Sequence, residues 1–396
     1  MPTTGEQMSQ PPHPNQQRGP KARICMPSTR TISREAFQSG LYEAQDVLAE
    51  TNDVDLIDLQ AGWGFRSRDR WQRRLLYRGV SQSLAYMNPG LQRVRLTQDY
   101  DLLIAVCQNF WDLLYINAID GWKERCKTSV CWLGEIWAAD ILANRDLLRA
   151  LRSFDYVFLN SQGTVGPLSD FLDRQCHFLP TGVDTIRFNP LPKNPNRSID
   201  VYNIGRRWEG VHQRLLQAAS EGGLFYVYDS YQSMATMEPI DYKQHRELFA
   251  NMAKRSKYFL VWPGKMNLPE ETQGQVEIGY RYFEGAAAGA VMIGQAADCA
   301  AFHDLFPWPG AVVEIQPDGS DALSVLADLS SNPERVSAIS RRNASESLLR
   351  HDWIYRWKRI FELSGVETSP GMNAREEHLK GLAGAAFPPQ AGSLSL

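Results

Sequence analysis

The sequence predicts an α/β protein with parallel sheets, divided into two domains. The chain has 396 residues, enough for two domains of about 150–200 residues that each bury a core. Short apolar runs of about four to seven residues, rich in β-branched and aromatic side chains, alternate with amphipathic stretches typical of helices. Strands that alternate with helices in this way usually pair in parallel, because each helix returns the chain to the same edge of the sheet.

The composition is that of an ordinary soluble protein. Hydrophobic residues make up 43% of the chain, and the formal net charge of −3 gives no general attraction to nucleic acid or to an anionic membrane. The six cysteines form no Cys-x-x-Cys pair, and the sequence contains neither an apolar run of about 18 residues nor a signal-like N-terminus. These features predict reduced cysteines and a cytoplasmic protein without a membrane span.

One stretch combines charges, aromatic rings and small residues in an order that predicts a ligand site. Residues 275–295 have the sequence QVEIGYRYFEGAAAGAVMIGQ. The small residues predict a short helix close to a sheet, closed by Gly289 with positive φ and followed by a buried strand over 290–293. The polar residues fall at the N-terminal end of this helix, where free N–H groups favour phosphate, and a carboxylate one turn further can bind sugar hydroxyls. A nucleotide carries both groups.

Three segments resemble one family, the group 1 glycosyltransferases, and in particular their spore-maturation-protein-like subset. RYFEGAAAGAVMIG (281–294) resembles the donor-binding segment, LPTGVDTIRFNP (179–190) the interdomain segment, and RHDWIYRWKRIFEL (350–363) the closing helix. The resemblance implies the GT-B fold, in which two Rossmann-like domains with parallel sheets face each other across a cleft. It also implies a nucleotide-sugar donor that is held mainly by the second domain.

The resemblance makes Glu284 the residue expected to bind the ribose of the donor. Many relatives carry a second glutamate eight residues earlier, but Val276 occupies that position here and Glu277 follows it. Glu277 and Tyr280 are therefore further candidates for donor binding. The alternative for this stretch is an ordinary surface helix packed on a sheet.

The same resemblance places a turn after the first strand of the second domain close to the donor phosphates. In IDVYNIGRRW, Arg206 and Arg207 occupy this turn, and guanidinium groups bind phosphate oxygens in pairs. Lys265, in the loop after the apolar run YFLVWPG, is a further candidate for phosphate binding. The alternative is that these arginines are ordinary exposed residues of a turn and bind no phosphate.

The expected chemistry is transfer of a sugar without a metal. Arg207, Arg281 and the start of the helix near Gly279 are expected to stabilise the leaving diphosphate. Glu135, in CWLGEIW at the end of an apolar run, is the candidate general base if the reaction inverts the anomeric centre. If the reaction retains that centre, Glu135 orients the acceptor or the sugar, and its structural alternative is a helix-capping acid.

Two aspartate pairs have the spacing of the Asp-x-Asp metal signature found in the other large glycosyltransferase fold. Asp53 and Asp55 precede an apolar run, as do Asp99 and Asp101, whereas carboxylates that bind a metal should follow a strand. We therefore expect no metal and no other cofactor.

The expected organisation has five segments. They are a disordered N-terminal segment (1–20), an N-terminal acceptor domain (21–188), a C-terminal donor domain (189–350), a helix that crosses back to the first domain (351–365) and a disordered tail (366–396).

The segment RSRDRWQRRLLYR, residues 66–78, carries six arginines around a tryptophan. It is either a helix for peripheral membrane contact or for an anionic acceptor, or a solvated arginine face on a helix packed against the core.

The expected partners are a nucleotide-sugar donor and an acceptor that is a glycan, lipid, peptide or small molecule, with no nucleic acid. The alternative functions are a non-catalytic GT-B protein that binds a partner or polysaccharide, and a nucleotide-sugar epimerase.

Overall fold

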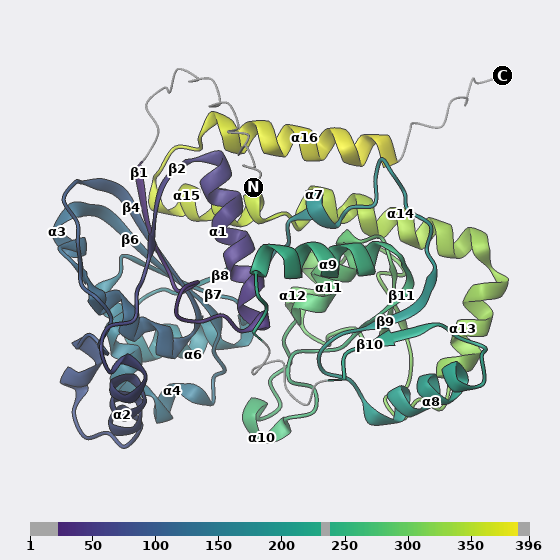
Figure 1. Ribbon diagram of the computed structural model, residues 1–396, viewed down its shortest axis with the longest axis horizontal. Coiled ribbons are helices and arrows are strands. Elements are labelled where there is room, and N and C mark those ends of the chain that lie inside the picture. Colours follow the sequence, from purple (N-terminus) through teal and green to yellow (C-terminus); the bar gives the residue numbers. More distant parts are fainter. Residues whose placement is uncertain (1–22, 231–237, 387–396) are drawn as a thin grey trace, which may run out of the picture.

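The computed structural model describes residues 23–230 and 238–386, which form two parallel sheets covered by helices (Figure 1). The predicted disordered segment 1–20 and the last residues of the predicted tail, 387–396, lie outside this range. Within the described range, no helix has the length and apolarity that crossing a bilayer requires.

The first sheet has six strands in the order β2-β1-β4-β6-β7-β8, and each is parallel to its neighbours. The strands are β1 Arg23–Ser28, β2 Asp53–Asp58, β4 Tyr100–Asn109, β6 Cys126–Glu135, β7 Tyr156–Leu159 and β8 His177–Phe178, and a separate pair is β3 Val94–Arg95 with β5 Ile119–Asp120. The helices are α1 Ser39–Thr51, α2 Phe65–Tyr77, α3 Trp122–Arg125, α4 Asp140–Ala143, α5 Arg145–Leu148, α6 Gln162–Leu172 and α7 Thr185–Phe188, with 3-10 turns η1 Ala36–Gln38, η2 Gln82–Tyr86, η3 Phe110–Ala118 and η4 Arg149–Ser153. Because β1 lies between β2 and β4, the strand order reverses between β1 and β4.

The second sheet has five parallel strands in the order β10-β9-β11-β12-β13. The strands are β9 Ile199–Asn203, β10 Tyr226–Tyr228, β11 Ser256–Val261, β12 Val291–Gly294 and β13 Val312–Glu314. The helices are α8 Glu209–Ser220, α9 Tyr242–Lys254, α10 Pro269–Thr272, α11 Tyr280–Ala287, α12 Ala300–Leu305, α13 Ala322–Ser331 and α14 Pro333–Arg350. Here the strand order reverses between β9 and β11, and ligands of open parallel sheets bind outside the carboxyl ends of the strands at such a point.

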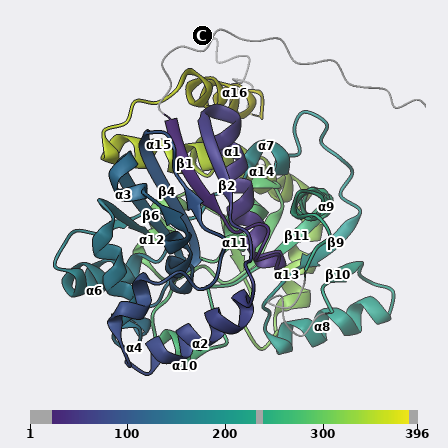
Figure 2. The ribbon, with the colours of Figure 1, turned by 60° about the vertical axis from the view of Figure 1, so that its left-hand side comes forward.

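Helix α15, Trp353–Ser364, returns the chain from the second domain to the first sheet (Figures 1 and 2). It begins after a break at His351, where the carboxylate of Asp352 accepts a hydrogen bond from the N–H of Ile354 at 3.0 Å. Its Trp353 and Trp357 lie edge-on to Trp132 of β6, with ring centroids 5.8 and 5.6 Å away. These buried aromatic contacts fix the helix against the first domain.

The predicted disorder of the segment 366–396 is wrong for residues 370–386, which form helix α16, Pro370–Ala386. Met372 and Leu379 of this helix are fully buried in the core that also contains α1 and α15. Arg375 donates hydrogen bonds to Asp184 at 2.7 Å and to Asp352 at 2.8 Å. The Gly- and Ala-rich composition suggested disorder because the few apolar residues of this helix gain their partners only from distant parts of the chain.

The two aspartate pairs lie at the amino-terminal side of the first sheet. Asp53 and Asp55 are the first and third residues of β2, Asp99 directly precedes β4, and Asp101 is the second residue of β4. Glu135 is the last residue of β6, at the opposite edge. In a parallel sheet, the aspartates are therefore separated from the edge that faces the cleft of this fold.

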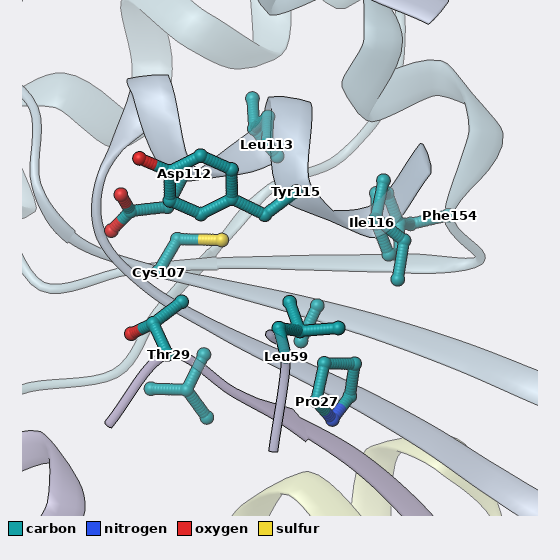
Figure 3. A pocket seen from close by; sticks show the side chains of 11 residues that line it. Pro27, Thr29, Leu59, Cys107, Asp112, Leu113, Tyr115, Ile116 and Phe154 are labelled. Carbon is teal, nitrogen blue, oxygen red and sulfur yellow. The ribbon is translucent and has the colours of Figure 1, made fainter. Parts of the chain in front are cut away.

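A small cavity lies where the strand order of the first sheet reverses (Figure 3). Its volume is about 20 Å³, and it is bordered by Pro27, Thr29 and Leu59 on one side and by Asp112 and Tyr115 on the other. Burial raises the pKa of Asp112 to about 6, although Arg73 and backbone N–H groups act against this rise. A space of this size suits one water molecule, so it is too small for a nucleotide.

Candidate functional site

The candidate site lies at the carboxyl edge of the second sheet, where the strand order reverses between β9 and β11. The turn after β9 carries Arg206 and Arg207, and the loop after β11 carries Lys265. Helix α11 begins at Tyr280 beside the same edge. The sheet topology therefore brings together three of the segments singled out in the sequence.

Helix α11 forms as the sequence predicts, with small residues that allow it to lie close to the sheet. A Cβ atom at Gly285 would stand only 2.8 Å from Cδ1 of Phe259 on β11, so a larger residue would push the helix away. Gly289 has φ of +59° and ends the helical segment before the buried strand β12. The N-terminal turn of α11 is thus held at the carboxyl edge of the sheet.

Glu284 is buried beneath this edge, and both of its carboxylate oxygens are paired. Arg246 of α9 donates to one oxygen and Arg281, one turn before Glu284 on α11, donates to the other. Only 2% of the Glu284 side chain is exposed. The carboxylate expected to bind the ribose is therefore positioned by two guanidinium groups.

Arg246 connects Glu284 to the first domain. Its Nε and Nη2 atoms donate to the two oxygens of Glu43 on α1 at 2.9 and 3.0 Å. Glu43 also accepts hydrogen bonds from Arg187 at 3.0 Å and from the indole N–H of Trp353 at 3.0 Å. Burial acts to raise the pKa of the Glu43 carboxyl, but its ion pairs with Arg246 and Arg187 and its hydrogen bonds hold that pKa below its ordinary value.

Sequence reasoning missed Arg246 and Glu43. Each lies within an amphipathic helical stretch, where a charged residue normally faces solvent. The available signal was weak: in the sequence, Glu43 stands between Tyr42 and Ala44, and only the structure shows that residues 39–45 are all buried. A buried charge needs a partner, but the sequence does not say which one.

The three candidate arginines differ in how much of their charge is already paired. Arg281 donates from Nε to the carbonyl of Ile204 at 3.1 Å, so it spans from α11 to the turn after β9. Arg207 donates from Nη1 to the backbone carbonyl and to the carboxylate of Asp229, both at 2.8 Å. Arg206 is exposed and contacts Asn267 at 3.3 Å. Arg281 thus brings one guanidinium to the turn that carries the other two.

Lys265 and Glu135 form an ion pair between the two domains. Nζ of Lys265 lies 2.8 Å from Oε1 of Glu135 and 2.8 Å from Oε2 of Glu271. Burial lowers the pKa of Lys265, but these two carboxylates more than compensate, and the pKa is raised overall. Glu135 keeps 43% of its side chain exposed. The residue expected to act as a base therefore faces a cation of the donor domain.

Glu277 also contacts the first domain, but as a cap of helix α6. Its carboxylate accepts hydrogen bonds from the N–H groups of Gln162 at 3.0 Å and Gly163 at 2.8 Å, and from the amide of Gln275 at 2.6 Å. Only 5% of Glu277 is exposed, and burial raises its pKa. Its carboxylate is therefore already used to join the domains at the N-terminus of α6.

Tyr280 lies at the start of α11, with its ring against the first domain. A Cβ atom at Gly40 of α1 would be 3.4 Å from Cε1 of Tyr280, so the two helices are in close contact there. Burial raises the pKa of the Tyr280 hydroxyl to about 12, so this group stays protonated at neutral pH.

Comparisons with solved structures find the same fold in other proteins. An alpha-glucosyltransferase in complex with UDP and a 13-mer DNA containing a central A:G mismatch matches with a TM-score of 0.53 and 15% identity, over 87% of this chain and 100% of that chain. The N-terminal domain of trehalose-6-phosphate phosphatase from Candida albicans matches with a TM-score of 0.51 and 10% identity, over 88% of this chain and 98% of that chain. At this level of identity, the matches show the fold alone.

The chain is therefore a two-domain protein with the GT-B fold. Residues 201–362 match a family model described as "Glycosyl transferase-like", and this match covers the second sheet, α11 and most of α15. The second domain is thus similar to the glycosyl transferase-like family, in agreement with the group 1 resemblance of the sequence. No curated protein matches the chain in sequence.

Proposed function

We propose that this protein transfers a sugar from a nucleotide-diphosphate sugar to an acceptor, without a metal. The observation that carries the proposal is the arrangement at the carboxyl edge of the second sheet. There, Arg281 extends from the start of α11 to the turn of Arg206 and Arg207, and Glu284 lies directly behind it. The family match of the second domain and the UDP held by an alpha-glucosyltransferase of the same fold support this proposal.

The donor diphosphate would lie between the N-terminal turn of α11 and the turn after β9. Free N–H groups of the helix, Arg281 and Arg207 would stabilise the negative charge that develops as the diphosphate leaves. Arg207 uses only Nη1 for Asp229, so Nε and Nη2 remain for phosphate as far as the described residues show. Arg206 and Lys265 lie on the same edge as additional cations.

Glu284 would accept hydrogen bonds from the ribose hydroxyls. Each carboxylate oxygen has two acceptor positions, so a hydroxyl can bind beside the arginine that already donates to that oxygen. The two arginines hold the carboxylate in one orientation, which lowers the entropic cost of binding the donor.

Glu135 would act at the acceptor. If the reaction inverts the anomeric centre, its carboxylate takes the proton of the acceptor hydroxyl, and the ion pair with Lys265 must open first. A donor phosphate that attracts Lys265 would open this pair and leave Glu135 free. If the centre is retained, Glu135 has only an orienting role.

A non-catalytic GT-B protein is the second candidate, and the role of Glu277 favours it. Glu277 is the carboxylate nearest in sequence to the position where the family pattern has its second glutamate. This carboxylate already accepts hydrogen bonds at the N-terminus of α6. A donor could then bind without being turned over.

Slow donor hydrolysis distinguishes the two functions. The chain is incubated with UDP-, GDP-, ADP- and dTDP-sugars in EDTA, and release of the nucleoside diphosphate is measured. Binding is measured separately by thermal shift, because a ligand at about 100 times its Kd stabilises the folded protein by about 2.7 kcal/mol. Release that exceeds that of an Arg281→Ala control supports a transferase, and stabilisation by a donor without any release supports the non-catalytic candidate.

A further inference from the structure

Helix α2 has one face in the core of the first domain and an opposite face in solvent. The buried side chains are Phe65, Gln72 and Leu76. Arg73 also turns inward, where it pairs with Asp69 at 2.8 Å and donates to the hydroxyl of Tyr115 at 2.6 Å. The inward face is therefore fully explained by packing and by this internal ion pair.

The outward face carries a row of arginines with no acid among them. Arg66, Arg70, Arg74 and Arg78 follow one another at intervals of four residues, so they lie along one side of the helix, and all four are exposed. No carboxylate in the described ranges forms a salt bridge with any of them. The only acidic residue of α2, Asp69, faces the other way. The chain as a whole has a net charge of −3, so this positive face is a local feature.

Large aromatic side chains stand between and beside these arginines. Trp71 is 60% exposed and Tyr77 is 66% exposed, and Trp63 in the preceding loop is 91% exposed. Val80 and Met87, shortly after the helix, are also more than half exposed. Solvated arginines alone would need no such apolar neighbours, so the exposed apolar surface calls for a partner.

We propose that the exposed face of α2 docks the protein on an anionic lipid surface. Tryptophan and tyrosine favour the boundary between lipid headgroups and acyl chains, while a row of arginines binds anionic headgroups. Val80 and Met87 favour lipid over nucleic acid, because aliphatic side chains gain from contact with acyl chains but do not stack on bases. The contact is peripheral, since a single face of one helix is involved.

The docking surface lies at the same edge of the first sheet as Glu135, the residue proposed to act at the acceptor. Helix α2 follows the carboxyl end of β2, and Glu135 stands at the carboxyl end of β6 in the same parallel sheet. Helices α2, α4 and α10 lie along one edge of the molecule in both views (Figures 1 and 2). Docking would therefore bring this edge close to the lipid surface. The docking itself does not depend on the proposed transfer of a sugar.

Co-sedimentation of the full chain with vesicles tests this proposal. Vesicles of phosphatidylcholine alone are compared with vesicles that contain phosphatidylglycerol, at about 0.1 M NaCl. Each arginine near an anionic surface is worth about a fivefold change in partitioning, so Arg70→Gln with Arg74→Gln should weaken binding by about 30-fold. Trp71→Ser should weaken it by about tenfold. In about 1 M NaCl, the arginine contribution should disappear, because the screening length falls from about 10 to about 3 Å.

The matched control is Arg341→Gln with Arg342→Gln, which removes the same charge from exposed positions of α14 in the second domain. The partitioning of this control onto anionic vesicles should stay within twofold of that of the native chain. Equal binding to neutral and anionic vesicles, or equal losses in both double variants, would overturn the proposal. The proposal would also be overturned if the native chain did not bind vesicles but bound duplex DNA through Arg70 and Arg74. An unchanged melting temperature in all variants shows that the fold is intact, and donor hydrolysis measured without vesicles reports on the proposed function separately.

Discussion

Replacing Arg246 with methionine is expected to destabilise the folded protein by about 3–5 kcal/mol. Arg246 is 4% exposed and lies between two buried carboxylates, Glu43 and Glu284. Methionine fills much of the same space but leaves both carboxylates without their shared cation. Removing one partner of a buried ion pair costs about this much, and here Glu43 keeps only Arg187 and Glu284 keeps only Arg281 as a charged partner among the described residues.

A thermal melt measures this loss. For a domain of 150–250 residues, each kcal/mol lowers Tm by about 2–4 °C, so a decrease of about 6–20 °C is expected. Arg341→Met is the matched control, since Arg341 is exposed and, among the described residues, its side chain hydrogen-bonds only to the hydroxyl of Ser337. Its effect should stay within about 0.5 kcal/mol.

The dependence on pH identifies the cause. In the native chain, the pKa of Glu43 lies below its usual value of 4.5, so the stabilisation is present above that pH and is lost as the pH falls through the folded pKa. Without Arg246, only Arg187 and the hydrogen bonds of Glu43 oppose the effect of burial, so this pKa is expected to rise above 4.5. The destabilisation caused by the variant is then greatest at high pH, where the carboxyl is charged, and shrinks as the carboxyl becomes protonated. The difference in Tm between native chain and variant should therefore be smaller at pH 5 than at pH 8. The reasoning would be refuted if Arg246→Met lowered the stability by less than about 1 kcal/mol. It would also be refuted if the difference in Tm between the native chain and the variant grew on acidification.

Four further predictions concern the donor site and the domain contacts. Glu284→Gln should weaken donor binding by about 1–3 kcal/mol in calorimetry, and unchanged affinity would remove Glu284 from the site. Arg281→Ala and Arg207→Ala should each lower kcat/KM while the native enzyme stays active in EDTA; strict dependence on Mn²⁺ or Mg²⁺ would contradict this. Glu277→Ala should lower stability by about 1–2 kcal/mol through loss of the cap on α6, whereas weaker donor binding at unchanged Tm would indicate the donor-binding role expected from the sequence. Deleting residues 366–396 should lower Tm by several degrees, because buried apolar side chains of α16 are lost, and deleting only 387–396 is the control.

The fold was predictable because its signals are local. Alternation of apolar runs with amphipathic stretches predicted parallel strands and helices, and the structure has two parallel sheets. The segment around Glu284 was predicted as a helix closed at Gly289 and followed by a strand, and the structure confirms it. Helix α16 was missed because its sparse apolar residues show no strong period and are stabilised by contacts outside the segment.

The sequence by itself determined most of the secondary structure, the GT-B class and the candidate residues near α11. Only the tertiary structure decided which charges pair. Glu43 and Arg246 are 203 positions apart, and Gln162 and Glu277 are 115 apart, so no local pattern links them. Whether a carboxylate is free for a ligand or bound by an arginine depends on how the two domains face each other. That arrangement is set by the packing of α1, α9 and α15, through contacts between residues far apart in the chain.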